Sequence, residues 1–285
     1  GIDAFADVLP QLTGTLDRTP QDMARRSYHG AADLPPDAGH LPFGRGTDAV
    51  LRLVRALDHG DRPNPVTTPK LSLGGTLVLA PSASRAAGQG APGKILSTDP
   101  FIVATSDGAV TLTDLRRADG APLDLAALAQ VGKTVVPFDP AHLPHIEAAA
   151  RADRHHRATF ATFDPLRLHL SGQGGTTCDL GDGHDWSDLL PRLVAALGGC
   201  ADVAVATPST SAHVGGWAPF RLDADTTPED LACLRARGGF ASDLPARLPG
   251  ADATLPDLAL STTGPLPGAA VTLVLADDTA TLHAD

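Results

Sequence analysis

The sequence has little of what marks membrane or nucleic-acid-binding proteins. Its longest apolar runs, such as Val271–Ala276, fall far short of the ~20 residues that a membrane-spanning helix needs. Lys and Arg number 22 against 33 Asp and Glu, which gives a net charge of −11. A chain this acidic lacks the basic surface that neutralises phosphates. We therefore expect neither a membrane nor a nucleic acid as partner.

Cysteine is also scarce. Cys178, Cys200 and Cys233 are odd in number and widely spaced, so they predict neither a disulfide framework nor a CxxC metal site. No basic segment followed by an apolar stretch marks a secretory signal near the N-terminus. Both features predict a cytoplasmic protein. The chain starts at Gly1 and its single methionine is Met23, which predicts a segment of a longer polypeptide.

What is present is a composition able to form a core. Apolar residues make up 42% of the 285 residues and charged residues 19%. A chain of this length predicts two domains of about 100–200 residues each. The 29 glycines and 25 prolines indicate many turns and short elements rather than a helical bundle.

The first half predicts helices followed by short strands. Expected helices lie at 4–12, 19–28, from Thr47 to about Gly60, and 124–131. Val50, Leu51, Val54 and Leu57 share one face of the third helix, which Thr47 is expected to cap. Expected strands lie at 76–80, 94–96, 101–105 and 109–115, with Asp107-Gly108 as a hairpin turn. This pattern predicts a small sheet or barrel.

The second half predicts a mixed α/β arrangement. Expected helices lie at 143–163, after an N-cap at Asp185, and after a capping box at Thr227. Expected strands lie at 166–170, 202–207, 218–223, 258–261, 270–276 and 279–283, with a loop at 171–177. Trp186 and Trp217 are interpreted as anchors of the core.

The stretch from Gly88 to Lys94 has the spacing of a phosphate-binding loop, with Gly93 directly before the lysine. Ile95 stands where magnesium coordination needs Ser or Thr, and a strand is expected to follow instead of a helix. Without a helix N-terminus, the loop has little with which to hold a phosphate. We interpret it as a turn that leads into a strand.

His155-His156 is similar to the start of the HHxxxDG loop of acyl-transferring condensation enzymes. In that loop the second His acts near the attacking amine and the Asp holds the loop. Here Phe160-Ala161 stand where Asp and Gly are needed. The histidines also lie in a predicted helix beside Arg151, Arg154 and Arg157. We therefore interpret them as part of a solvated basic helix face.

Two further histidine groups are candidate sites. His142 and His145 could be metal ligands, but Pro144 breaks their helical spacing and no third ligand is evident. His184-Asp185 suggests a catalytic pair, but Asp185 is expected to cap a helix and no Gly-x-Ser-x-Gly elbow supplies a nucleophile. We therefore predict no catalytic, cofactor-binding or metal-binding residue in this chain.

Several stretches of the first half resemble one known family. They lie at 20–22, 26–30, 53–60, 64–65, 69–71, 92–96 and 105–109. Together, from Ala4 to about Leu123, they resemble the C-terminal part of formyltransferase-like domains. These belong to the methionyl-tRNA formyltransferase superfamily, in the variety fused to nonribosomal peptide synthetases. The family's catalytic Asn, His and Asp and its H-x-SLLP stretch have no counterpart here, so no catalytic residue is carried over.

The second half, from about Pro137 to Asp285, is similar to the C-terminal lobe of condensation domains. The stretches that carry this resemblance are 185–190, 202–208, 213–223 and 242–247. The part of that family which holds HHxxxDG is absent, and Trp217-Ala218 replace the family's Asn-Leu pair.

The two resemblances imply an α+β, mixed fold. Residues 1–135 would form helices and a small OB-like β-barrel of the formyltransferase C-terminal kind. Residues 136–285 would form an α/β half-domain that resembles one lobe of a condensation (CAT-like) fold.

The leading hypothesis is a non-catalytic structural or interaction region of a nonribosomal peptide synthetase. Its partners would be the adjacent adenylation or carrier protein domains that it positions. The alternative is an accessory part of a formyltransferase that orients the acceptor, with the catalytic domain upstream. A third hypothesis is a docking module for carrier proteins. Formyl-tetrahydrofolate and phosphopantetheine are implied by resemblance for the parent protein, and no cofactor is expected in this chain. Whether the chain is itself an enzyme stays open.

Overall fold

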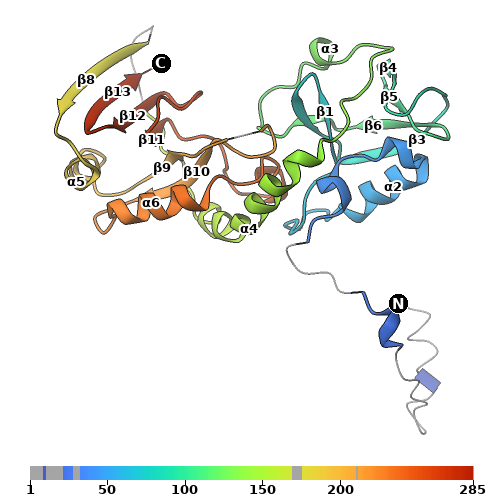
Figure 1. Cartoon of the computed structure of the whole chain (residues 1–285), viewed down its shortest axis with the longest axis horizontal. Coiled ribbons are helices and arrows are strands. Elements are labelled where there is room, and N and C mark those ends of the chain that lie inside the picture. The colour runs from blue at the N-terminus through green and yellow to red at the C-terminus, as the bar shows by residue number, and fades with distance from the viewer. Residues whose placement is uncertain (1–8, 11–21, 28–32, 169–174, 210, 285) are drawn as a thin grey trace. The chain divides into compact units, whose positions relative to one another are not determined.

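The computed structural model describes residues 9–10, 22–27, 33–168, 175–209 and 211–284 (Figure 1). Residues 1–33 and residues 34–285 form two compact units. In the first unit, Met23–Arg25 (η2) form a short 3-10 turn that Asp22 caps by accepting a hydrogen bond from the Ala24 N–H. The helix predicted over 4–12 lies outside the described residues except at 9–10. The one predicted over 19–28 is described only from residue 22 to 27, where η2 is its helical part.

The first half of the second unit, by which we mean residues 34–135, contains short antiparallel strands. In chain order these are β1 (Lys70–Leu73), β2 (Thr76–Leu79), β3 (Ser82–Ala86), β4 (Ile95–Thr98), β5 (Phe101–Ala104), β6 (Ala109–Thr113) and β7 (Arg116–Arg117). One sheet has the order β1-β2-β7 and the other the order β3-β6-β5-β4. The Asp107-Gly108 turn joins β5 to β6 in a hairpin, as predicted.

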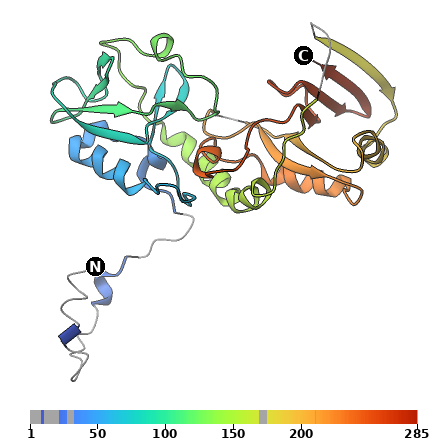
Figure 2. The same ribbon diagram turned by 180° about the vertical axis from the view of Figure 1, so that it is seen from behind.

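Helix α2 (Thr47–Ala56) packs against β3 and β6 (Figures 1 and 2). Its buried Val50 and Val54 join Leu71 of one sheet and Val103 and Val110 of the other in a single apolar core. The apolar face predicted for this helix is therefore confirmed. Two sheets around a shared core fit the mixed α and β class, while a closed OB-like barrel is not confirmed.

The N-terminus of α2 differs from its prediction in one respect. Thr47 is the first helical residue, and Gly46, with φ of 89°, takes the capping position. The missing acceptor comes from Asp107 in the β5–β6 turn, whose Oδ1 lies 2.7 Å from the Thr47 backbone N and 2.9 Å from its Oγ1. A Cβ on Gly46 would lie 2.8 Å from Asp107 Oδ2, so the close approach requires glycine there.

The second half, by which we mean the chain from residue 136 onward, contains one large sheet and several helices. The strands are β8 (Thr176–Asp182), β9 (Ala201–Ala206), β10 (Trp217–Leu222), β11 (Leu258–Ser261), β12 (Val271–Ala276) and β13 (Thr279–Ala284). The α-helices of unit 2 after α2 are α3 (Leu125–Leu128), α4 (Leu143–Phe160), α5 (Trp186–Ala196) and α6 (Pro228–Arg237). Short 3-10 turns lie at η3 (Pro36–Gly39), η4 (Phe43–Arg45), η5 (Pro140–His142) and η6 (Pro245–Arg247).

The large sheet has the order β10-β9-β11-β12-β13-β8. Its centre, β9, β11 and β12, is parallel, and its outer strands pair antiparallel. The buried strands β11 and β12 are apolar apart from Ser261 and Thr272, which is typical of parallel strands covered on both faces. Leu190 and Val194 of α5 and Leu231 and Leu234 of α6 pack into the core of this sheet.

Local signals at the helix ends are confirmed here. Asp185 accepts a hydrogen bond from the Asp188 N–H at the start of α5, and Thr227 with Asp230 forms a capping box at the start of α6. Trp217 packs edge to face against Phe160 and Phe240, as expected of a core anchor. Trp186 is half-buried beside the core of the large sheet.

Two predictions around residue 170 differ from the structure. Residues 166–168 form no strand, although the Leu166 N–H donates to the Asp202 carbonyl, and 169–170 lie outside the described residues. Strand β8 begins at Thr176, inside the predicted loop 171–177. Its side chains are almost all exposed, and its sequence lacks the alternation of polar and apolar residues that predicts a strand with one buried face.

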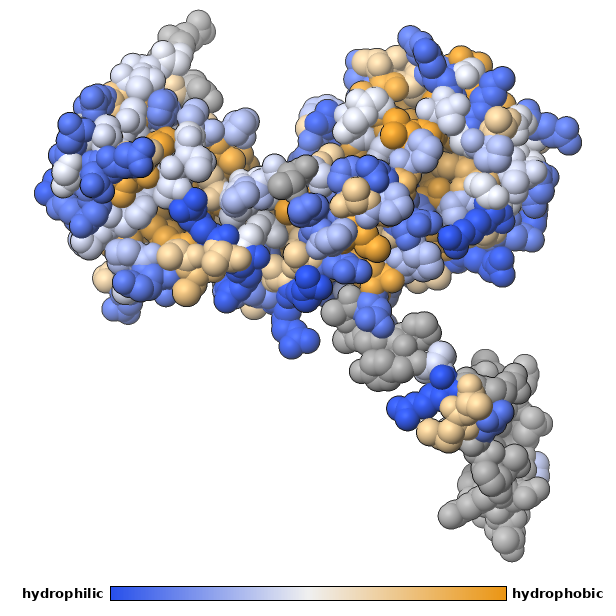
Figure 3. Space-filling view, viewed as in Figure 1, coloured by the Kyte–Doolittle hydropathy of each residue, from blue (hydrophilic) through white to orange (hydrophobic). Residues whose placement is uncertain are grey.

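The surface carries polar and charged residues with apolar residues in small groups between them (Figure 3). Cys178, Cys200 and Cys233 are free and exposed, in line with the expectation of no disulfide framework. Among the described residues, no helix is both long and apolar enough to cross a membrane. The apolar cores of the two halves consist of different residues, and the domain boundary at 135/136 stays a prediction.

Candidate functional site

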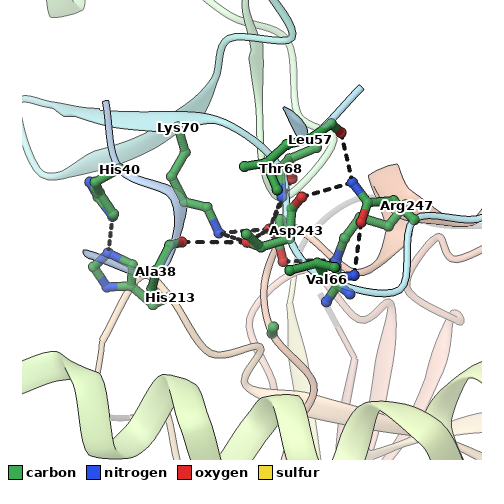
Figure 4. A network of polar contacts seen from close by, with 12 residues as sticks. Ala38, His40, Leu57, Val66, Thr68, Lys70, His213, Asp243 and Arg247 are labelled. Carbon is green, nitrogen blue, oxygen red and sulfur yellow. Dashed lines mark hydrogen bonds and ion pairs between the residues drawn. The ribbon is translucent and has the colours of Figure 1, made fainter. Parts of the chain in front are cut away.

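Buried polar and charged side chains gather where the two halves meet (Figure 4). We call this group the junction, and its members are Thr67, Thr68, Lys70, Asp153, Asp243 and Arg247. The side chains of Lys70, Asp243 and Arg247 are 4%, 1% and 1% exposed. Burial of so much charge is uncommon unless every ion is paired.

Three different elements bring the junction residues together. Lys70 is the first residue of β1, and its carbonyl accepts a hydrogen bond from the Leu41 N–H at 2.9 Å. Asp153 lies on α4, the helix that both views place between the two halves (Figures 1 and 2). Arg247 ends η6, and Asp243 lies in the turn just before η6, where an ion pair of 3.2 Å joins Arg247 Nε to Asp243 Oδ1.

Asp243 is the centre of the junction. Its Oδ2 accepts hydrogen bonds from Thr67 Oγ1 at 2.7 Å, from the Thr68 N and Oγ1, both at 2.9 Å, and from Lys70 Nζ at 2.6 Å. Its Oδ1 accepts from Arg247 Nε at 3.2 Å. Every donor to Oδ2 comes from the first half, so this one carboxylate ties residues 67–70 to the second half.

Arg247 extends the junction to α4. Its Nη2 donates to Asp153 Oδ2, and its backbone carbonyl accepts from the Asn64 N–H at 3.0 Å. The Asn64 carbonyl in turn accepts from Arg157 Nη2 at 3.0 Å. Side-chain and backbone contacts therefore both cross between the halves.

The electrostatics of the junction are balanced, with two carboxylates against two cations. Burial alone would raise the pKa of Asp243, but Arg247 and Lys70 hold that pKa well below its ordinary value. Burial lowers the pKa of Lys70, against the attraction of Asp243. Burial also raises the pKa of Asp153, while the pKa of Arg247 stays raised by both carboxylates despite its burial. Asp243 is thus the firmly ionised partner of both cations.

A cluster of aromatic rings borders the junction. His40 Nε2 lies 2.9 Å from His213 Nε2, and the His40 ring centroid lies 4.7 Å from that of Phe138. The His142 ring lies 5.0 Å from the His213 ring. Burial, with Lys70 nearby, lowers the pKa of His40 to about 3 and that of His213 to about 4. Both rings are therefore neutral near pH 7.

In the junction, the charged groups bond to one another and to nearby threonines across the two halves. Both oxygens of Asp243 are occupied by protein donors, and the ammonium of Lys70 is bonded to Asp243 and Thr67. No acid, base or nucleophile of this group is left free to meet a substrate. Each charged group of the junction has an oppositely charged partner, although Arg247 Nη1 has no hydrogen-bond partner within the described residues. Removal of one partner would leave a buried charge uncompensated, so the network favours the arrangement in which the two halves are joined.

The loop from Gly88 to Lys94 leads into strand β4, as expected of a turn. At its end, the Gly93 N–H is bonded to the Ala104 carbonyl and the Lys94 N–H to the Ala91 carbonyl. These two backbone donors are therefore not available to a phosphate.

The remaining histidine candidates do not converge on a ligand. His142 lies beside His213, whereas His145 is exposed. His184 bonds Asp188 and the Leu180 carbonyl at the start of α5. In the described part of the chain, no group of three or more His, Cys, Asp and Glu side chains is arranged to hold a metal.

The interpretation of His155-His156 as a solvated face is wrong for the second histidine. His155 is exposed, but His156 is 0% exposed, and its Nε2 donates to the Gly238 carbonyl at 3.0 Å. Burial lowers its pKa to about 4. The reason is that α4 carries a second buried face, with Asp153 and His156 turned toward the chain around Gly238.

The sequence did not reveal the junction. Lys70, Asp243 and Arg247 all lie in stretches that carried the family resemblances, but nothing local marks them as buried. The one available signal was Lys70 itself, a charge between Pro69 and the apolar Leu71 at the start of a strand.

Part of the chain is similar to known proteins. No protein-family profile matches it. The methionyl-tRNA formyltransferase of Rhodopseudomonas palustris (strain HaA2) is 32% identical over 123 residues, 41% of this chain and 38% of the relative. That of Macrococcus caseolyticus (strain JCSC5402) is 30% identical over 137 residues, 47% of this chain and 42% of the relative. That of Pseudomonas syringae pv. syringae (strain B728a) is 39% identical over 117 residues, 40% of this chain and 35% of the relative.

The chain thus contains a formyltransferase-like region, as the first sequence resemblance predicts. It spans only between 35% and 42% of the length of these three relatives. The link to peptide synthetases and the resemblance to a condensation lobe stay predictions.

Proposed function

We propose that this chain is an accessory region of a formyltransferase-type polypeptide, which holds the acceptor of the formyl group in place. The observation that carries the proposal is the identity of 30–39% to methionyl-tRNA formyltransferases over 40–47% of the chain. The junction supports it, because a positioning region needs a defined shape, and the buried ion pairs join its two halves to one another.

The charge of the chain argues for an acceptor other than tRNA. The name of the relatives specifies methionyl-tRNA, whose phosphates call for Lys and Arg on the binding surface. This chain has a net charge of −11, and its two most buried cations are already paired within the junction. An amine carried by a protein domain or a small molecule suits an acidic surface better.

The more specific role in a nonribosomal peptide synthetase, next to adenylation or carrier domains, rests on sequence resemblance alone. It agrees with an acceptor delivered by a protein domain. We keep it as the finer form of the same proposal, and the carrier protein as its testable partner.

The first test is binding. The whole chain is titrated against a fluorescently labelled tRNA and against a labelled carrier protein, with and without phosphopantetheine, at low and physiological salt. We expect saturable binding of the modified carrier and none of tRNA. Tight tRNA binding that weakens steeply with salt would contradict the choice of acceptor.

The second test is catalytic. Formyl transfer is measured for a polypeptide that carries this chain behind a formyltransferase catalytic domain, with Asp243→Asn as the disrupted form and the exposed Asp225→Asn as its matched control. We expect Asp243→Asn to raise the KM for the acceptor and to leave the KM for the formyl donor unchanged. Equal kinetics in all three proteins would overturn the accessory role.

A further inference from the structure

A cleft of about 370 Å³ opens beside the first half's sheets, within the range of about 300–1,000 Å³ typical of small-molecule sites. Its walls are mostly apolar and include Phe43, Leu71, Val136 and Phe138. The charged residues that line it, Asp37 and Arg45, are partly exposed and lie 3.7 Å from one another as an ion pair. No uncompensated charge therefore faces a ligand.

One polar side chain of the cleft is almost fully buried. His40 is 5% exposed and lines the cleft. Its Nε2 is occupied by His213. Within the described residues its Nδ1 has no hydrogen-bond partner, and this atom is not fully buried. Nδ1 is therefore the polar atom that His40 offers to solvent.

The tautomer of His40 follows from its partner. His213 Nδ1 is buried and has no hydrogen-bond partner in the described part of the chain. A buried N–H without an acceptor is rarer than a buried acceptor without a donor, which favours a His213 that carries its proton on Nε2. His213 then donates to His40 Nε2, and neutral His40 carries its own proton on Nδ1. In this tautomer the Nδ1–H group of His40 is a hydrogen-bond donor available to the cleft.

We propose that this cleft binds a small neutral molecule with a flat apolar body and one carbonyl oxygen, which accepts a hydrogen bond from Nδ1 of His40. The half-buried ring of Phe138 and the exposed side chain of Val136 supply apolar area for the flat body, and the buried Phe43 and Leu71 form the floor beneath them. The burial of His40 makes its donor selective, because a ligand without an acceptor leaves this N–H unpaired. The cleft lies beside the half that resembles formyltransferases, but the proposal does not depend on the acceptor proposed above.

The first experiment observes His40 directly. The full chain, labelled with ¹⁵N in its imidazole rings, is studied by NMR near pH 7 and titrated with benzamide, and with toluene as the probe that lacks the carbonyl. We expect His40 to be protonated on Nδ1 and benzamide to shift that nitrogen in a saturable way. His156, buried against Gly238 in another part of the fold, is the internal reference that stays unshifted.

The second experiment blocks the cleft. Val136 lines the cleft and is 49% exposed, whereas Val131 is 63% exposed and is not a lining residue. Val136→Trp is expected to weaken benzamide binding at least tenfold, and Val131→Trp to leave it unchanged. Both substitutions are at exposed positions, so both chains are expected to fold, which their thermal unfolding checks.

His40→Phe completes the test, because it keeps an aromatic ring and removes the donor. We expect it to abolish the preference for benzamide over toluene. Protonation of His40 on Nε2, equal binding of the two probes by the unaltered chain, or equal effects of the two tryptophan variants would each overturn the proposal.

Discussion

The apolar core of the first half consists of aliphatic and aromatic side chains, whereas the junction buries two carboxylates and two cations. In the core each side chain contributes in proportion to the apolar area that it buries, so loss of one has a graded effect. In the junction the favourable state depends on an opposite charge for every charged group, because a charge left alone in a buried site is strongly unfavourable. The two regions should therefore respond differently to substitution.

The largest effect is expected at the centre of the junction. Asp243→Asn keeps the shape of the side chain but leaves Lys70 and Arg247 with a single buried counter-charge, Asp153. We expect the free energy of unfolding to fall by about 3–5 kcal/mol, as for other buried pairs that lose one partner. Urea denaturation followed by circular dichroism measures it.

The control for this prediction is Asp225→Asn, at an exposed carboxylate. Its expected change is within about 0.5 kcal/mol. If the two variants are equally stable, the buried pairing contributes nothing and the contrast between core and junction is lost.

The next effect separates the two cores. Leu112→Ala in the first half and Leu260→Ala in the second each remove a fully buried side chain and are expected to cost about 2–5 kcal/mol. Both tryptophans, Trp186 and Trp217, lie in the second half, so their fluorescence reports on that half only. With the junction intact, we expect Leu112→Ala to shift the fluorescence transition as well as the dichroism.

In a chain that also carries Asp243→Asn, the fluorescence transition is expected to stop following Leu112→Ala. That outcome would assign the coupling between the halves to the junction. An unmoved fluorescence transition for Leu112→Ala in the otherwise unaltered chain would show that the halves unfold separately from the start.

The next effect, which is smaller than the two above when counted per pH unit, concerns pH at the edge of the junction. The pKa of His40 is about 3 in the folded chain and 6.5 in its ordinary range, so below pH 6.5 the unfolded chain binds more protons there. Stability therefore falls as pH falls from 6.5 toward 3, by up to about 1.4 kcal/mol per pH unit from this residue. The charges that face His40 are Lys70 and Asp243, with His213 and His142 beside it.

His40→Gln is expected to reduce this slope, measured by urea denaturation at several pH values between 6.5 and 4. The comparison variant is His145→Gln, at an exposed histidine, which should leave the slope unchanged. A His40→Gln chain with the same pH dependence as the unaltered one would mean that His40 titrates equally in both states.

The smallest effect is expected at a polar contact outside the junction. Thr227→Ala removes the side chain that caps α6 and is expected to cost about 1 kcal/mol. Thr263→Ala, at an exposed loop threonine, is the matched control with little change. A loss at Thr227 as large as that of Asp243→Asn would erase the distinction between an exposed and a buried polar contact.

Prediction from sequence succeeded where a local pattern determines the structure. The capping box at Thr227, the period of α2 around Val50 and the apolar run of β11 each depend on residues within a few positions of one another. The predicted barrel and condensation lobe rest on resemblance, and only the formyltransferase-like region is supported by relatives.

Prediction failed where distant segments decide. β8 has no alternating pattern and is a strand because β13 pairs with it. His156 looks like a surface residue until the chain around Gly238 covers it. Asp243 and Lys70 are 173 residues apart, so no window of sequence shows that they neutralise one another.

Lys70 also has a consequence for the alignment of strands. In the β1–β2 hairpin it pairs with Leu79, and Leu71 pairs with Val78. A slip of one residue would reverse which side chains face the second half and put an aliphatic group opposite the Asp243 carboxylate. The ion pair therefore favours one register of a hairpin that contains several leucines. The carboxylate of Asp243, in the second half, thus stabilises the strand register of a sheet in the first half.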